Sequence, residues 1–150
     1  LHHITMSLDD VLGSGLNPHY FCKPILKTKK DRDALLNLAL SGDEKISFGS
    51  DSAPHLESNK LKQNGAAGIF SAPILLPKLC EIFEKHKKLE NLQKFISDNA
   101  RKIYDLQNIP NKTITLIKES FKVQDIIVIG DDRIIPLLAG KSLSWRIKDL

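Results

Sequence analysis

The order of apolar segments between residues 20 and 48 constrains the fold of this chain more than any other feature. An apolar run over residues 20–26 has the length of a strand. Pro24 has no backbone N–H to give to a sheet ladder, so we expect this strand to end near Lys23. The segment therefore predicts a short strand followed by a turn.

An amphipathic helix is predicted next, from Asp31, because apolar residues recur there at helical spacing. Ser41–Gly42 supplies the stop signal of that helix, and residues 46–48 predict a second short strand. Parallel strands need a long connection, usually a helix. The order strand, helix, strand therefore favours parallel strands in an α/β fold.

Polar residues follow the second predicted strand, and two of them carry useful chemistry. Functional residues of such folds lie at the carboxyl ends of strands, where Asp51 and His55 are placed. The Asp51 carboxylate suits a metal ligand that also moves a proton, and it equally suits a local turn in which it bonds backbone amides. His55 suits a partner for a substrate carboxylate, and it equally suits a solvated loop position.

The other elements are expected from capping residues, periodicity and turn residues. Residues 56–71 are polar and predict a loop over the same strand end. We also expect a helical turn over 7–12 that is capped by Ser7, a helix that Pro77 opens, and a further helix over 89–96. Strands are expected over 113–117 and 125–129, with a turn at 130–132 after the second strand.

Composition excludes several classes of protein. A chain of 150 residues is large enough for one core, and we expect a single domain over 1–150. The net charge of +4 is low for a nucleic-acid binder, and no apolar run is long enough to span a membrane. Cys22 and Cys80 lie far apart in sequence, which predicts neither a disulfide framework nor a zinc knuckle and favours a reducing cytoplasm.

Three further motifs are weaker. Residues 49–53 approach a nucleophile elbow, but Asp51 stands where the serine is needed, so a serine hydrolase is disfavoured. His2 and His3 are expected to point to opposite sides of a strand as packing or solvated side chains. The basic run 85–88 is expected to close a helix C-terminus.

Several segments together resemble one family, in its order and at similar spacing. They are Asn17-Pro18-His19-Tyr20-Phe21-Cys22-Lys23-Pro24-Ile25-Leu26-Lys27, Gly49-Ser50-Asp51-Ser52-Ala53-Pro54-His55, Gly65-Ala66-Ala67-Gly68 with Ala72-Pro73, and Pro136-Leu137-Leu138-Ala139-Gly140 to Leu143-Ser144-Trp145. This set resembles the carboxyl-terminal half of type II dihydroorotases. The Asp-Ser-Ala-Pro-His signature carries most of the resemblance.

The resemblance implies the carboxyl-terminal portion of an amidohydrolase-type (β/α)8 TIM barrel, followed by helices and a short tail with strands. It also implies two Zn2+ ions and reversible hydrolysis of the cyclic amide of dihydroorotate in pyrimidine biosynthesis. Asp51 would end the eighth strand, bind one zinc ion and move a proton to the amide nitrogen. His55 would hold the substrate carboxylate, and the backbone at Lys23 and Ala67 would bond the ring amide and carboxylate groups.

The chain lacks the other zinc ligands of that family, which belong to its amino-terminal half. Neither His2 nor His3 replaces them, and both are expected outside the metal cluster. Because a complete barrel needs about 200 to 250 residues, we expect an amino-terminal half as a partner. The resemblance also implies a small-molecule substrate and possible pairing as a homodimer. The alternatives are an inactive fragment or interaction domain, and an amidohydrolase for another cyclic amide such as a hydantoin.

Overall fold

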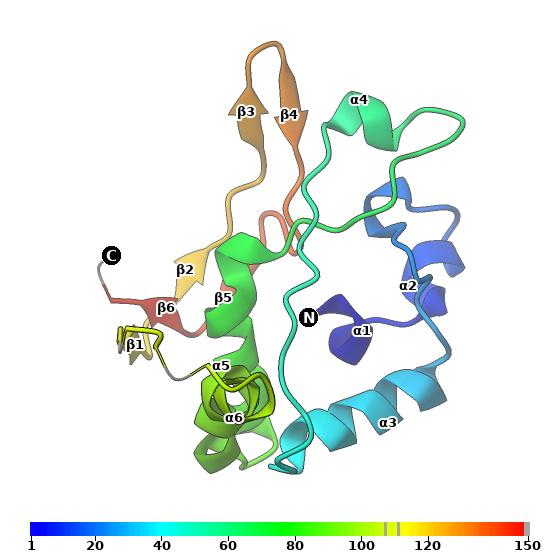
Figure 1. The fold of residues 1–150 in the computed structure, drawn as a ribbon. Coiled ribbons are helices and arrows are strands. Elements are labelled where there is room, and N and C mark those ends of the chain that lie inside the picture. Colours follow the sequence, from blue (N-terminus) through cyan, green and yellow to red (C-terminus); the bar gives the residue numbers. More distant parts are fainter. Residues whose placement is uncertain (107, 111, 149–150) are drawn as a thin grey trace.

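The computed structural model describes residues 1–106, 108–110 and 112–148, in which helices come first along the chain and short strands follow (Figure 1). The helical elements are α1 (His2–Thr5), α2 (Leu8–Leu12), η1 (Pro18–Tyr20), α3 (Lys29–Leu40), α4 (Glu57–Lys60), η2 (Ala72–Ile74), α5 (Leu75–Lys85), η3 (Leu89–Asn91), η4 (Lys94–Asp98) and α6 (Asn99–Ile103). The strands are β1 (Leu116–Ile117), β2 (Phe121–Lys122), β3 (Ile127–Ile129), β4 (Asp132–Ile134), β5 (Ser142–Leu143) and β6 (Arg146–Ile147). The fold is therefore a mixed helix and strand assembly.

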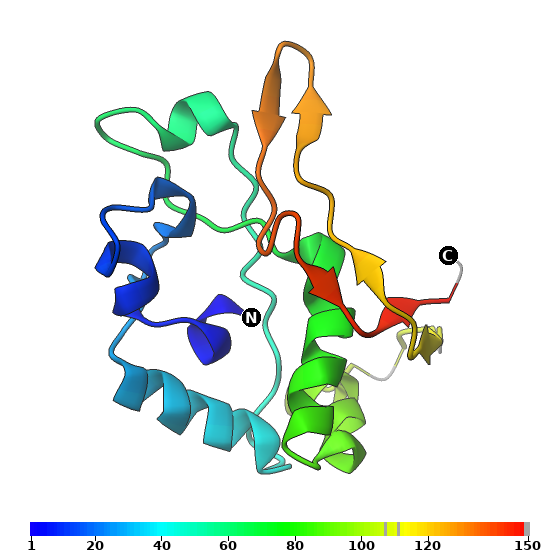
Figure 2. The ribbon, with the colours of Figure 1, turned by 180° about the vertical axis from the view of Figure 1, so that it is seen from behind.

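The six strands form three antiparallel pairs that are nested inside one another. β1 pairs with β6, β2 with β5, and β3 with β4. The tail is thus one long, interrupted hairpin, whose β3–β4 tip projects beside α4 (Figure 2). Gly130 takes the first position of the closing turn with φ 60°, a conformation that suits glycine.

The core is built around α5, whose apolar face is fully buried. Leu79 and Phe83 are both 0% exposed, and the ring of Phe83 lies 5.6 Å from the ring of Phe95 in η4. The hairpin packs on the same helix, because the indole of Trp145 donates to Glu84 at 2.9 Å. Helix α5 therefore joins the hairpin to the rest of the molecule.

Two predicted helices are confirmed. Helix α2 begins after the predicted cap Ser7, which forms a reciprocal capping box with Asp10. Helix α3 ends at Leu40 beside the predicted stop, but it begins at Lys29, two residues before the predicted start at Asp31. The reason is that Thr28 forms the same kind of capping box with Asp31.

The two predicted strands at 20–23 and 46–48 are wrong as ladder elements. The first lies partly in the 3-10 helix η1, and residues 46–48 are extended without a ladder partner in the described part of the chain. Residues 41–50 instead contact η4 and α6. The backbone N–H of Phe48 donates to the Phe95 carbonyl at 2.8 Å, and the side-chain amide of Asn99 donates to the Ile46 carbonyl at 2.7 Å. A strand is defined by its neighbours, and the described residues supply none here.

The other boundaries differ in smaller ways. Helix α5 begins at Leu75, after the 3-10 turn η2, so Pro77 lies inside its first turn rather than at its first position. The predicted helix over 89–96 is a series of 3-10, π and α segments that continues to Ile103. The predicted strands over 113–117 and 125–129 shorten to β1 and β3, and the basic run 85–88 does follow the end of α5.

Among the described residues, no helix is both long and apolar enough to cross a membrane. Cys22 and Cys80 are both free, and both are buried.

Candidate metal centre and substrate loop

Asp51 ends the extended segment in an unusual backbone conformation. Its φ of 46° lies in the left-handed region, which aspartate tolerates better than most residues. The side chain is 57% exposed, so the carboxylate is accessible to solvent and to a ligand. A residue held in this backbone conformation at the end of the extended segment is a reasonable candidate for function.

The imidazoles of His2 and His3 lie beside this carboxylate. His2 Nε2 is 3.3 Å from Asp51 Oδ2, and His3 Nε2 is 3.9 Å from the same oxygen. Both residues belong to α1, and their ring centroids are 4.6 Å apart. The expectation that they point to opposite sides of a strand is wrong, because a helix turns neighbouring side chains by far less than a strand does.

His2 is fully buried, yet neither of its ring nitrogens has a hydrogen-bond partner among the described residues. Burial lowers the pKa of His2 to about 4, so the ring is neutral at pH 7. A buried polar atom without a partner is costly, and such atoms often mark the place of a missing ion or proton donor. The carboxylate of Asp51 and a neutral imidazole are donor types that zinc accepts, so the residues present fit a zinc ion at Asp51.

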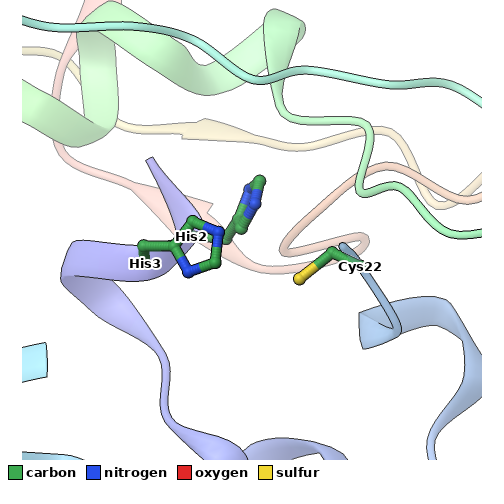
Figure 3. A group of neighbouring side chains, drawn as sticks. All are labelled: His2, His3 and Cys22. Carbon is green, nitrogen blue, oxygen red and sulfur yellow. The ribbon is translucent and has the colours of Figure 1, made fainter. Parts of the chain in front are cut away.

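Cys22 completes this cluster from the segment after η1. Figure 3 shows its sulfur facing the two rings, and the ligand atoms of His2, His3 and Cys22 lie within 4.8 Å of one another. The thiol donates to the carbonyl of Pro24 at 3.3 Å, and burial raises its pKa. Because zinc binds thiolate rather than thiol, Cys22 is the poorest ligand of the group.

The open space next to Asp51 is a small apolar pocket. It has a volume of about 230 Å3, and its lining includes Asp51, His3, Phe48 and Phe95. A larger hollow of about 790 Å3 lies between α3 and α5 and contains neither Asp51 nor His55. We regard the smaller pocket as the relevant one, because polar groups capable of chemistry converge on it.

The structure joins two of the predicted substrate residues to each other. His55 Nε2 lies 3.0 Å from the carbonyl oxygen of Ala67. Since a carbonyl can only accept, Nε2 must carry the hydrogen and Nδ1 remains for another partner. A Cβ on Gly68 would lie 2.8 Å from His55 Nε2, so glycine is needed for this close approach.

The loop at 64–68 also contacts the backbone before Lys23. The N–H of Gly68 donates to the carbonyl of Phe21 at 3.0 Å. Within the described residues, the main-chain N–H groups of Lys23 and Ala67 have no backbone acceptor. The loop predicted over 56–71 is interrupted by the short helix α4, and its later part brings Ala67 towards the segment that carries Lys23.

The sequence analysis expects both His2 and His3 outside the metal cluster, but α1 places both imidazoles beside the Asp51 carboxylate. One further residue that matters here is not singled out by the sequence analysis. Lys60, in α4, is only 5% exposed and bonds the backbone of this loop. Nothing in the sequence distinguishes it from the solvated lysines around it.

Comparison with known proteins gives a consistent result. The dihydroorotase of Helicobacter pylori (strain G27) is 59% identical over 150 residues, which are 100% of this chain and 44% of that protein. The dihydroorotase of Helicobacter hepaticus is 61% identical over 149 residues, which are 99% of this chain and 43% of that protein. The search against family models found no match.

Solved structures agree with these relatives. The crystal structure of dihydroorotase from Campylobacter jejuni matches with a TM-score of 0.88 and 46% identity, over 99% of this chain and 42% of that one. The chain matches the carboxyl-terminal part of dihydroorotases. A second dihydroorotase structure, from Saccharomyces cerevisiae in complex with 5-fluoroorotic acid, matches with a TM-score of 0.89 and 35% identity, over 98% of this chain and 41% of that one.

The chain spans less than half the length of the dihydroorotases that it matches, and it corresponds to their carboxyl-terminal part. The resemblance read from the signature at Asp51–His55 is therefore confirmed. The roles of Asp51, His55, Lys23 and Ala67 remain predictions.

Proposed function

We propose that this chain supplies the carboxyl-terminal part of a zinc-dependent dihydroorotase, which interconverts N-carbamoyl-L-aspartate and L-dihydroorotate in pyrimidine biosynthesis. The match of nearly the whole chain to dihydroorotase structures is the observation that carries this proposal. The yeast structure is a complex with 5-fluoroorotic acid, which is a pyrimidine carboxylate like the proposed substrate. A site with a histidine and free backbone donors suits such a ligand.

The proposed fold of the assembled enzyme is a (β/α)8 barrel, to which this chain gives the last strands. Residues 41–50 and the segment around Lys23 support this, because both lack ladder partners within the described residues. Parallel neighbours from the amino-terminal part would supply those partners. The carboxyl ends of these segments, where Asp51 and Lys23 lie, would then open on the face that carries barrel active sites.

In this proposal Asp51 holds one zinc ion, and most of the other ligands come from the amino-terminal part. When bound, zinc polarises a carbonyl and lowers the pKa of a coordinated water to about 7. We assign His2 the task of orienting the Asp51 carboxylate, because its Nε2 lies 3.3 Å from Oδ2 in a buried position. Groups that fix a ligand in this way commonly tune metal affinity.

The second task of Asp51 is to move a proton. An amide nitrogen is a poor leaving group unless it is protonated, so a carboxylate beside the reacting centre accelerates cleavage by taking up a proton and delivering it there. The Asp51 side chain is half-exposed and lies next to the small pocket, which suits this role. In the reverse direction, the Asp51 carboxylate removes a proton from the attacking amide nitrogen as the ring closes.

The substrate is held by groups on either side of the loop. We assign the substrate carboxylate to Nδ1 of His55, which must carry its own hydrogen and donate it, because a carboxylate can only accept and Nε2 already bonds the Ala67 carbonyl. The backbone N–H groups of Lys23 and Ala67 donate to the ring amide and to the carboxylate. These roles need no particular side chain at residues 23 and 67.

The resemblance also implies a cytoplasmic enzyme that can form a homodimer. Sedimentation equilibrium of the assembled enzyme tests this dimer. A molecular mass at micromolar concentration that equals one assembled enzyme, rather than two, would argue against the homodimer.

The direct test is an Asp51→Asn substitution in the assembled enzyme, meaning this chain together with its amino-terminal part. We expect loss of dihydroorotate turnover by at least about 100-fold, since a metal ligand and a proton carrier are removed together. Glu44→Gln is the matched control, because Glu44 is exposed and pairs only with Lys102. Turnover unchanged by Asp51→Asn would refute the proposed function.

A further inference from the structure

Lys60 is buried to an extent that is unusual for lysine. It closes the short helix α4 and is 5% exposed, although lysine is almost never fully buried unless it is paired. Its ammonium group donates to the carbonyl oxygens of Phe21 at 2.9 Å, Ala66 at 2.9 Å and Gly68 at 2.7 Å. Three N–H donors thus meet three acceptors, which satisfies the ammonium completely.

This arrangement is a poor way to stabilise a fold. No carboxylate pairs with Lys60 among the described residues, and burial lowers its pKa. Desolvation of an ammonium group without an anionic partner costs free energy, and the three hydrogen bonds offset that cost. The specific effect of Lys60 is therefore to fix where three backbone carbonyl groups lie.

The three acceptors surround the backbone groups that we propose for substrate binding. Ala66 and Gly68 flank Ala67, and Phe21 stands two residues before Lys23. The Gly68 N–H also donates to the Phe21 carbonyl, so Lys60 and Gly68 together join the loop to the earlier segment. Lys60 therefore lies at the junction that sets how far the backbone of Ala67 is from the backbone of Lys23.

Helix α4, which carries Lys60, is held in place by contacts with neighbouring elements. Glu57 in the same helix accepts a hydrogen bond from Arg133 on the β3–β4 hairpin, and its carboxylate lies 3.8 Å from His19 Nε2. The helix also packs against η1 and against β4. Contacts on both sides of α4 thus hold the lysine while its amine reaches into the loop.

We propose that Lys60 is a positioning residue for the substrate, which acts by holding the backbone of residues 66–68 against that of Phe21. This inference rests on the proposed function, because it assumes that the backbone at Lys23 and Ala67 binds the substrate. It assigns Lys60 no contact with the reacting atoms. Its effect should therefore appear in substrate binding and leave zinc and the chemical step nearly intact.

The test compares Lys60→Met with Lys60→Arg in the assembled enzyme. Methionine keeps the length and removes every donor, whereas arginine keeps the charge and part of the donor set. Lys62→Met is the matched control, because Lys62 is two residues away, exposed, and bonds only the side chain of Asn59. The readouts are KM and kcat for dihydroorotate, the Kd for 5-fluoroorotate, and zinc content.

We expect Lys60→Met to raise KM and the Kd for 5-fluoroorotate by about tenfold or more, since a small misplacement of binding groups is costly. Its kcat should stay within about threefold and its zinc content should stay at the parent level, because the reacting groups are untouched. Lys60→Arg should fall between Lys60→Met and the parent, and Lys62→Met should match the parent. If Lys60→Met does not accumulate in soluble form, the test rests on Lys60→Arg, for which an increase in KM of about threefold or more with unchanged zinc content is required.

Two results would overturn the inference. One is an unchanged KM and Kd in a folded variant at residue 60. The other is a parallel loss of kcat, zinc and substrate binding, which would mean a merely structural role. Failure of the proposed function looks different, because the parent enzyme itself would then neither turn over dihydroorotate nor bind 5-fluoroorotate.

Discussion

His2 Nε2 lies 3.3 Å from Asp51 Oδ2, and the imidazole is fully buried while the carboxylate is half-exposed. The buried, neutral imidazole of His2 thus lies on the inner side of the Asp51 carboxylate, and this carboxylate lines the small pocket. The residue proposed to bind zinc is therefore held by a neighbour that is 49 positions earlier in the sequence.

Substitutions at His2 test this support. If His2 orients Asp51 by donating a hydrogen bond, His2→Gln should keep zinc affinity within about threefold, because an amide N–H can replace the ring N–H. His2→Leu should weaken zinc binding by about 10-fold to 100-fold, as is usual when the partner of a metal ligand is removed. Competition with a zinc-sensitive chelating dye measures both. His86→Gln serves as the control, since it lies at the end of α5 outside the cluster.

Equal and large losses of zinc in His2→Gln and His2→Leu would contradict the orienting role. They would mean that His2 is itself a ligand.

Gly68 gives a second prediction. A Cβ at this position would lie 2.6 Å from Ala53 Cβ, and the backbone φ of 156° is also unfavourable for side chains. Gly68→Ala should therefore displace the loop, raise KM for dihydroorotate and destabilise the protein by about 1 to 3 kcal/mol. Gly49→Ala is the matched control, because a Cβ there meets nothing within 4 Å. An unaltered KM for Gly68→Ala would show that the contact with His55 is unimportant.

The sequence predicts helices here far better than strands, for a physical reason. The cap at Ser7 and the stop at Ser41–Gly42 are local signals, and α2 begins and α3 ends where they indicate. The strand expected at residues 46–48 depends on distant neighbours, and the chain holds these residues instead through Phe95 and Asn99. Propensity alone cannot supply such partners.

The candidate site shows the same limit. The signature places Asp51 and His55 at the end of one segment, and this much can be read from spacing. The contact of His55 with Ala67 needs the loop to fold back over 12 residues. The burial of Lys60 depends on three carbonyl groups that sequence does not reveal. Such contacts become visible only when the backbone path is known.

Asn99 provides a prediction about stability. It is 6% exposed, and its amide donates to the carbonyls of Asp43 at 2.8 Å and Ile46 at 2.7 Å. Asn99→Asp removes these donors and places a carboxylate among carbonyl oxygens. We expect a loss of about 1 to 3 kcal/mol in the free energy of unfolding, measured by urea denaturation of the assembled enzyme. Asn37→Asp, on an exposed position of α3, should change it little.

The cysteines should be unreactive in the folded protein. Burial raises the pKa of Cys80 to about 11 and also raises the pKa of Cys22. Because the thiolate is the reactive form, neither should be alkylated quickly by iodoacetamide at pH 8, and peptide mapping of the modified sites measures this. A cysteine introduced at the exposed Ser14 should react at the rate of a free thiol. Rapid labelling of Cys22 would argue against its burial beside the histidines.

The most direct measurement is X-ray anomalous scattering at the zinc absorption edge, made on crystals of the assembled enzyme. The account predicts a zinc peak within coordination distance of the Asp51 carboxylate, about 2.0 to 2.2 Å from an oxygen. A zinc-loaded enzyme with no peak at Asp51, and with that side chain bonded to backbone amides of its own turn, would contradict it.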